Sequence, residues 1–541
     1  MKKFLLAIAA CLSVSAFYSQ VSHGGQPLSW SDKTLDQDIP FIHTPAIDPA
    51  QLAMEDAITD QHKDVPYRFG VEHEVNYTFE NSGRWVINDK QDFAVWQLGL
   101  ECPGAIAISV RFDQFHLPEG ANVFIWSADR QEFLGSFTAE NNKSNNRLAA
   151  GIIHGDKIVI EYIAPMASPD WGSLAIGQVV HGYRSFLVSR FAEEASADRG
   201  PFGNGGNCEN NINCPVGVDW QVEKRSVAII TEGGYGYCTG ALVNNTLNDG
   251  TPYFLTANHC TSGADVGDWV FYFNHESAMC SGTSGPVSQS ISGSTLKAHN
   301  AGSDFALLLL DEDPPASYNA QFAGWDASDD EDAVSAAVGI HHPSGDIKKI
   351  SFEEDAPYHD FADGAQVWWI DDWEDGVTEP GSSGSPLFNQ DHRIIGQLYG
   401  GASACNGSNG NGQFDYYGRF GVSWNTGTSN STRLRNWLDP EDSGVLVLDG
   451  FPDVFEGEGI RSAAIQHAEI YPNPASGSFS IKANSTITQV EVRDIAGRVV
   501  SSFKPYAASI SISSSQWVDG IYVISISAGK EIFTSRLAVQ H

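Results

Sequence analysis

Three short motifs carry residue types that together could activate a hydroxyl group. "YFLTANHC" places His259 after an apolar run, "GSDFALLLL" places Asp304 before one, and "PGSSGSPLF" places Ser383 between glycines. A serine hydroxyl is a poor nucleophile until a base takes its proton, and a carboxylate must hold that base in one tautomer. Each residue alone is more typical of a structural role. In the order His–Asp–Ser, the three predict a catalytic triad.

The glycines beside Ser383 have a chemical use as well. An oxyanion that develops during acyl transfer needs backbone N–H donors, and a tight turn with a glycine two residues before the serine can supply them. A stretch rich in glycine and serine, such as "EPGSSGSPLF" (379–388), is otherwise typical of a surface loop. The other two motifs favour the catalytic interpretation.

The three motifs resemble those of chymotrypsin-type serine endopeptidases, which have the same chain order. Across residues 208–450, a longer series resembles the bacterial lysyl endopeptidases: "CTGALVNNT", "YFLTANHC", "SDFALL", "GIHHPSGDIKKIS", "GVTEPGSSGSPLF", "IIGQLYGG", "YYGRF" and "WLDPEDSG". The resemblance implies a double β-barrel. It implies Ser383 as the nucleophile, His259 as the general base and then acid, and Asp304 as the orienting carboxylate. The N–H groups of Gly381 and Ser383 would form the oxyanion hole.

The resemblance also indicates the substrate pocket. Trypsin-like enzymes carry their selecting acid six residues before the serine, where this chain has Val377. Lysyl endopeptidases use an aspartate after the "QLxGG" segment, and Asp415 in "NGQFDYYGRF" matches it. A buried carboxylate favours Lys or Arg, because a neutral side chain would leave it unpaired. Tyr399 and Gly400 of "QLYGG" would line the same pocket.

Two observations leave the choice between lysine and arginine open. The lysyl enzymes have a histidine where Tyr399 stands, and a stacked tryptophan that has no convincing match in "APYHDFADG" (356–364). The linker before the catalytic unit contains Arg199 but no lysine, so an enzyme that activates itself there must accept arginine. We expect cleavage after basic residues with a preference for Lys. An arginine-preferring or dual enzyme is the alternative, and an inactive protease-fold adhesin is the rival from another class.

The first twenty residues are typical of an export signal. Lys2 and Lys3 precede an apolar run from Phe4 to Leu12, which is too short to span a membrane, and small residues follow it. Residues 8–11, "IAAC", also fit a bacterial lipid-attachment box. No other segment approaches eighteen uninterrupted apolar residues, so the sequence predicts no transmembrane anchor.

Six of the eight cysteines fall within one stretch of about 200 residues. In an exported chain, such a cluster predicts up to three disulfides, and spacing alone leaves fifteen pairings open. No C-x-x-C pair supports a zinc site, so we expect no metal and no cofactor. The lysyl endopeptidase resemblance implies the pairs Cys208–Cys405, Cys214–Cys280 and Cys238–Cys260.

The elements that must position these residues are mostly β-strands. Short alternating runs, such as Ile106, Ile108, Val110 and Phe112, predict strands with one buried face. We expect a signal peptide (1–20), a β-sandwich-like propeptide domain (21–199), a trypsin-like endopeptidase domain (200–450) that ends in a short helix near Leu434 and Leu438, a linker (451–465) and a small Ig-like β-sandwich (466–541).

The last unit contains "YPNPASGSF", "DIAGRVV" and "DGIYVI" and resembles the C-terminal sorting domain of type IX secretion. The resemblance implies the secretion machinery as a partner and an extracellular location, either released or attached to the cell surface. A carbohydrate-binding or spacer module is the alternative. The net charge of −36 excludes nucleic-acid binding through phosphate neutralisation, and protein and peptide substrates are the remaining partners. Trp368, Trp369 and Trp373 would either fill the core or line the cleft.

Overall fold

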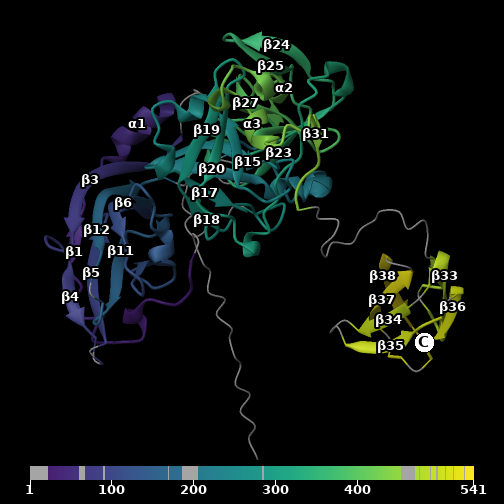
Figure 1. Ribbon diagram of the computed structural model, residues 1–541, viewed down its shortest axis with the longest axis horizontal. Helices are drawn as coiled ribbons and strands as arrows, with labels where there is room; N and C mark the ends of the chain where they lie inside the picture. Colours follow the sequence, from purple (N-terminus) through teal and green to yellow (C-terminus); the bar gives the residue numbers. More distant parts are fainter. Residues whose placement is uncertain are drawn as a thin grey trace, which may run out of the picture. The chain divides into compact units, whose positions relative to one another are not determined.

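The computed structural model describes residues 22–184 and 205–452, except 60–66, 89, 91, 169, 283 and 284, and residues 469–540 with short gaps (474, 488, 495–497, 506, 516, 519, 529 and 530). The chain forms two compact units, Met1–Pro452 and Asp453–His541. Strands dominate both units, as the alternating sequence pattern predicts (Figure 1). Among the described residues, no helix is long and apolar enough to cross a membrane. The predicted signal peptide, Arg199 and residues 453–465 of the second predicted linker lie outside the described residues.

The N-terminal part of the first unit is a sandwich of two β-sheets. The core lies between them, because alternate residues such as Ile108 and Val110 of one sheet face Ile158 and Ile160 of the other. A helix, α1 (Pro49–Thr59), precedes the second sheet. The first sheet contains β1 (Phe41–His43), β4 (Arg84–Ile87), β5 (Phe93–Glu101), β7 (Asn122–Ser127), β8 (Phe133–Phe137) and β11 (Lys157–Pro165). The second contains β3 (Gly70–Thr78), β6 (Ala107–His116), β9 (Leu148–Ala149), β10 (Ile153–His154) and β12 (Ser173–Gly182).

The C-terminal part of the first unit begins with an eight-stranded sheet that surrounds its own apolar interior. Phe254, Phe271 and Leu308 are fully buried there. In spatial order the strands are β18 (Ser290–Ser292), β17 (Val270–Phe273), β14 (Val227–Glu232), β15 (Tyr235–Leu242), β16 (Tyr253–Ala257), β20 (Phe305–Leu310) and β19 (Ser294–Asn300), and β2 (Tyr67–Arg68) also pairs with β15.

A ten-stranded sheet follows and has a second interior around Trp368, Leu387 and Tyr417. Its main path is β13 (Asn210–Asn211), β23 (Lys349–Glu353), β22 (Ala337–His341), β26 (Pro386–Asn389), β27 (Ile394–Gly401), β30 (Asp415–Arg419), β25 (Ala365–Ile370) and β24 (Tyr358–Ala362), with β21 (Trp325–Asp326) and β31 (Val447–Leu448) beside it. The two sheets share a core that includes Leu255 and Phe388. This is the mostly β architecture with two barrel-like sheets that the sequence predicts. The expected short helix is α3 (Arg435–Leu438), and α2 (Phe420–Asn425) precedes it.

The C-terminal unit is a small sandwich of a three-stranded and a four-stranded sheet. The described strands are β32 (Glu469–Tyr471), β33 (Ser478–Ile487), β34 (Gln489–Asp494), β35 (Val499–Phe503), β36 (Ala507–Ser513), β37 (Gly520–Ala528) and β38 (Glu531–Val539). Val490 and Val492 of β34 and Ile524 and Ile526 of β37 are buried in its core, as the period of two predicts.

Candidate active site

His259 and Asp304 are in direct contact at the ends of two neighbouring strands of the eight-stranded sheet. β16 ends at Ala257, two residues before His259, and β20 begins at Phe305, directly after Asp304. His259 Nδ1 lies 2.7 Å from Asp304 Oδ2, and the backbone N–H of His259 donates to Oδ1 at 2.9 Å. The carboxylate therefore fixes both the ring and the backbone of the histidine.

Asp304 is held in an environment that is unfavourable for a free carboxylate. It is buried, and burial raises the pKa of its carboxyl group, while the hydrogen bond and charge of His259 act in the opposite direction. Its φ angle is 49°, in the left-handed region, where a non-glycine residue is strained. Strain and burial at one residue are typical of a position that serves a site.

The remaining ring nitrogen of His259 is set up to accept a proton. Because Nδ1 donates to a carboxylate, the neutral ring carries its free lone pair on Nε2. Nε2 is out of contact with water and has no hydrogen-bond partner among the described residues. The imidazole thus presents an unsatisfied base atom.

The Ser383 loop packs against the end of the strand that leads to His259. The Thr239 N–H donates to the Ser383 carbonyl at 2.8 Å, and the Gly384 N–H donates to Leu398 O at 2.8 Å. A Cβ atom on Gly384 would lie 2.2 Å from Thr256 Oγ1 and 2.8 Å from Ala257 N. Glycine at 384 therefore permits a close approach of the serine loop to the strand that leads to His259.

Two backbone N–H groups in this loop remain available to a ligand. Neighbouring turns use the other amides, because Ser382 N donates to Glu379 O and Ser385 N donates to Ser382 O. Within the described chain, the amides of Gly381 and Ser383 donate no hydrogen bond. Gly381 has a φ of 92°, which turns the backbone there, and its carbonyl is held by Thr239 Oγ1 at 2.9 Å. The two N–H groups expected to form the oxyanion hole are thus available to a ligand, while the backbone at Gly381 is held in place by Thr239.

A buried histidine, His341, contacts the Ser383 loop through Ser382. His341 Nδ1 lies 2.8 Å from Ser382 Oγ, and its Nε2 lies 3.0 Å from Ser351 Oγ. Ser351 uses its own proton on the carbonyl of Val377, at 2.7 Å, so its oxygen accepts from His341 Nε2–H. His341 therefore links Ser382 to the segment that carries Val377.

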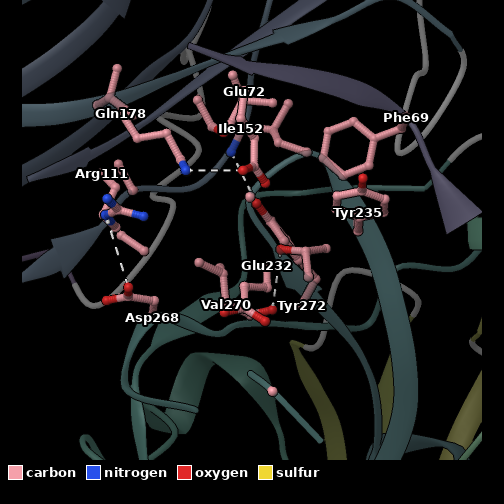
Figure 2. Close-up of a pocket in the computed structure, with 18 residues that line it drawn as sticks. Phe69, Glu72, Arg111, Ile152, Gln178, Glu232, Tyr235, Asp268, Val270 and Tyr272 are labelled. Carbon is pink, nitrogen blue, oxygen red and sulfur yellow. Dashed lines mark hydrogen bonds and ion pairs between the residues drawn. The ribbon is translucent and has the colours of Figure 1, made fainter. Parts of the chain in front are cut away.

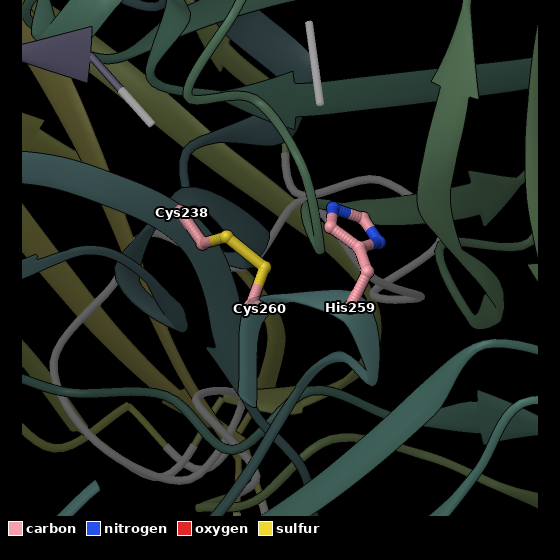
Figure 3. A group of neighbouring side chains, drawn as sticks. All are labelled: Cys238, His259 and Cys260. Atoms are coloured by element: carbon pink, nitrogen blue, oxygen red, sulfur yellow. A yellow bond between two sulfur atoms is a disulfide. The ribbon is translucent and has the colours of Figure 1, made fainter. Parts of the chain in front are cut away.

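Disulfides tie the site together. The structure forms Cys208–Cys405, Cys214–Cys280 and Cys238–Cys260, the three pairs that the resemblance implies, and Cys102 is free and buried. Figure 3 shows His259 next to Cys260, whose bridge to Cys238 joins the turn after β16 to β15. These three side chains also lie within metal-coordinating distance of one another, but both cysteine sulfurs are used in the bridge.

Asp415 lies fully buried at the start of β30. Its Oδ2 accepts three hydrogen bonds, from Trp373 Nε1 at 2.8 Å, Thr378 Oγ1 at 2.8 Å and Ser403 Oγ at 2.5 Å. A Cβ atom on Gly401 would lie 1.9 Å from Oδ1, so only glycine lets the chain pack this closely against the carboxylate, and the Ser403 N–H donates to Oδ1 at 3.4 Å. The sequence missed Trp373, Thr378 and Ser403 as partners of Asp415, because Ser403 lies in a different loop from the other two and no common spacing connects the three.

Tyr399 stands between the histidine and the pocket. The pairing of β27 with β30 shifts between Leu398 and Gly400, which makes Tyr399 the extra residue of a β-bulge. Its ring lies 5.8 Å from the His259 ring and 5.3 Å from the Tyr416 ring. Gly400 pairs with Tyr416, where a Cβ would come within 3.0 Å of the Tyr416 hydroxyl oxygen.

The aromatic neighbour sought in residues 356–364 comes from another strand. Trp369 of β25 stacks on Tyr416, with ring centroids 5.6 Å apart, and Tyr416 in turn contacts Tyr399. The three tryptophans thus differ in role, because Trp368 is buried in the interior of the second sheet, Trp369 belongs to this aromatic row and Trp373 contacts Asp415. Arg199, the expected cleavage point, lies outside the described residues.

Comparisons with known proteins agree with this geometry. Residues 202–418 match the family model for the lysyl endopeptidase C-terminal domain, and residues 469–540 match that of a secretion system C-terminal sorting domain. A lysyl endopeptidase of Pseudomonas aeruginosa is 27% identical over 336 residues, which is 58% of this chain and 69% of that protein.

Two crystal structures of the Rv3671c protease from Mycobacterium tuberculosis, in its active and inactive forms, are similar to parts of the chain. The active form has 14% identity and a TM-score of 0.26, and covers 40% of this chain and 91% of that one. The inactive form has 16% identity and the same TM-score, and covers 38% and 86%.

The chain is a serine endopeptidase by class, as the sequence predicts. More narrowly, its catalytic part resembles the lysyl endopeptidases, and its C-terminal unit resembles a type IX sorting domain. The sorting domain marks the protein for secretion, to the extracellular space or the cell surface.

Proposed function

We propose that residues 200–450 hydrolyse peptide bonds after basic side chains, preferably lysine, through Ser383, His259 and Asp304. The observation that carries this proposal is the Asp304-bound imidazole, whose Nε2 has no hydrogen-bond partner among the described residues, together with the packing of the Ser383 loop against the strand that leads to His259. Catalytic hydrogen bonds in an unliganded site are often long and tighten only with substrate, so a serine without an intramolecular bond is compatible with this role.

The residues act in a defined order. Ser383 Oγ attacks the scissile carbonyl while His259 Nε2 takes its proton, and Nδ1–H stays bonded to Asp304. The oxyanion accepts hydrogen bonds from the N–H groups of Gly381 and Ser383. His259 then gives its proton to the leaving amine, and water attacks the acyl-enzyme by the same route in reverse.

The surroundings of Asp415 favour lysine over arginine. A guanidinium prefers to bind a carboxylate through two parallel hydrogen bonds, one to each oxygen. Oδ2 of Asp415 already accepts from an indole and two hydroxyl groups. An ammonium group needs only a point contact, so the donors already on Asp415 hinder it less than they hinder a guanidinium. Selection of arginine, or of both side chains, is the alternative.

The rest of the chain serves export and activation. We infer a signal peptide at 1–20, a propeptide domain at 21–199 cut near Arg199, a linker at 451–465 and a sorting domain at 466–541 that binds the type IX machinery. Polypeptides are the substrates.

A digestion experiment tests the proposal. The processed enzyme is added to an unstructured protein, and the new fragment ends are identified by mass spectrometry. We expect ends after Lys in large excess over Arg, and labelling of Ser383 by a fluorophosphonate that Ser383→Ala abolishes. Ends after neutral residues, or no labelling, would reject the proposal, and the absence of labelling would favour a protease-fold adhesin.

A further inference from the structure

The N-terminal sandwich contributes a strand to the first catalytic sheet. β2 pairs antiparallel with residues 235–236 at the start of β15. Directly after β2, the N–H groups of Phe69 and Gly70 both donate to the carbonyl of Gly234, at 2.7 and 2.9 Å. The sandwich therefore binds the catalytic part through backbone hydrogen bonds, by the same strand addition through which many proteins capture extended peptides.

This added strand lies next to the Ser383 loop along one edge of β15. β14 covers the opposite edge of β15. On the edge that β2 occupies, Thr239 donates to the Ser383 carbonyl, and β16 pairs with residues 241–242. Only Tyr237 and Cys238 separate β2 from that contact. A polypeptide that extends from Ser383 along β15 would therefore meet β2.

An apolar face anchors the sandwich at this position. β14 and β17 bury one set of alternate residues, such as Ile230 and Phe271, in the interior of the eight-stranded sheet. The other set faces outward and is buried against the sandwich, where Val270 and Tyr272 belong to one cluster with Phe69. Strands that are apolar on both faces are typical of sheets covered on both sides.

Polar contacts surround the apolar face. Arg147 of the sandwich binds Asp268 and lies 2.9 Å from Asp265 Oδ2, and the Gly234 N–H donates to Glu72 Oε1 at 3.1 Å. A cavity of about 260 Å³ lies between the two parts. Figure 2 shows Arg111 directed toward Asp268 and Gln178 directed toward Glu72 in this cavity. These contacts fix the orientation of the sandwich on the sheet.

The sandwich nevertheless leaves the catalytic histidine accessible. The His259 side chain is 26% exposed in the presence of the sandwich, and Tyr399 and Gly400 are partly exposed. The His259 ring and the pocket residues are partly exposed while the adjacent sheet edge is occupied, and this difference distinguishes small substrates from long ones.

We propose that the N-terminal sandwich inhibits the enzyme by strand addition at β15, so that it excludes polypeptide substrates but admits small esters and amides. This inference rests on the proposed peptidase function. Inhibition arises from competition for the edge of β15, and His259, Asp304 and the Gly381 turn are already assembled in the uncut chain. Cutting the connecting segment leaves these contacts intact, so activation also requires that the sandwich leave the sheet.

The test compares the uncut full-length chain with the processed enzyme on three reagents. We expect a fluorophosphonate to label Ser383 in both forms, and a short lysine anilide to be hydrolysed by both at rates within about threefold. Casein should be cut at least about 100-fold more slowly by the uncut chain, because only casein needs the sheet edge.

Two results would overturn the proposal: equal suppression of anilide and casein hydrolysis in the uncut chain, or unhindered casein hydrolysis by it. If neither form hydrolyses the anilide or takes the label, the proposed peptidase function fails instead, so the two failures are distinguishable.

A matched pair of variants addresses the strand itself. Phe69→Pro removes the N–H that donates to Gly234, whereas Phe69→Leu keeps it and remains apolar. We expect the proline variant of the uncut chain to gain at least about tenfold in casein hydrolysis and the leucine variant to match the parent.

Hydrogen exchange at residues 234–237 gives an independent measurement in case Phe69→Pro does not fold. Exchange should be slower in the uncut chain than in the processed enzyme, and similar exchange in the two forms would contradict strand addition.

Discussion

The eight-stranded and the ten-stranded sheet each contribute a buried aspartate, and the two carboxylates accept hydrogen bonds from different kinds of donor. Asp304, from the first sheet, binds an imidazole that becomes cationic during the reaction. Asp415, from the second, is surrounded at Oδ2 by an indole and two hydroxyl groups, all neutral. Neutral donors stabilise a carboxylate without cancelling its charge. Under the proposed mechanism, the positive partner of the first aspartate lies inside the protein, and the substrate brings a cation to the second.

Replacing the first aspartate should have the largest effect. Asp304→Asn keeps the size of the side chain but favours the wrong tautomer of His259, and in enzymes of this type it lowers kcat by about 10⁴-fold. Rates on a lysine anilide give the measurement. Asp363→Asn is a matched control, because Asp363 is exposed and also has a positive φ, of 50°. A decrease of less than tenfold in Asp304→Asn would reject the role of Asp304.

Replacing the second aspartate should change selectivity rather than chemistry. For Asp415→Asn we expect kcat/KM on lysine substrates to fall by about 10³-fold, because the charge that binds the ammonium is lost. Fluorophosphonate labelling of Ser383 should persist, since the triad is intact. If fragment ends from a digested protein still follow lysine, Asp415 is not the selecting residue.

The link between the two regions can be tested at His341, which connects the serine loop to the Val377 segment. An Asn side chain can reach Ser382 as Nδ1 does, and a Gln side chain can reach Ser351 as Nε2 does. We expect His341→Ala to lower kcat about 10- to 100-fold with little change in KM, since a loosened oxyanion donor acts on the transition state. His341→Asn should recover more activity than His341→Gln. The reverse order would mean that the contact with Ser351 matters more.

We expect the smallest effect from a third buried carboxylate, that of Glu353. Glu353 is buried beside Asp355 and Glu374, and burial, followed by repulsion from Glu374, raises its pKa from 4.5 to about 8. A raised pKa in the folded state means that the stability linked to this group is present below pH 4.5 and is lost as the pH rises to about 8.

Glu353→Gln should therefore gain stability relative to the parent across that range, as measured by urea unfolding at several pH values. A constant difference between the two proteins would show that Glu353 titrates normally.

Local sequence was sufficient for the strands and for the choice of the three candidate triad residues. The alternation at Val490 and Val492 predicts strand β34, and the motifs around His259 and Ser383 locate two ends of the site, because short-range chemistry decides both. The disulfide pairs required the family resemblance, since spacing left fifteen choices open. The partners of Asp415 and the pairing of β2 with β15 could not be predicted, because they depend on how distant loops and strands meet after folding.

The bridge between Cys208 and Cys405 has a consequence for redox behaviour. Cys405 lies two residues after Ser403, whose hydroxyl group binds Asp415, so the bridge joins the wall of the proposed substrate pocket to the start of the catalytic part. The Asp304–His259 pair is secured by strands that this bridge does not touch. A mild reductant that opens this bridge alone would therefore broaden the choice of cleavage site while leaving acylation intact.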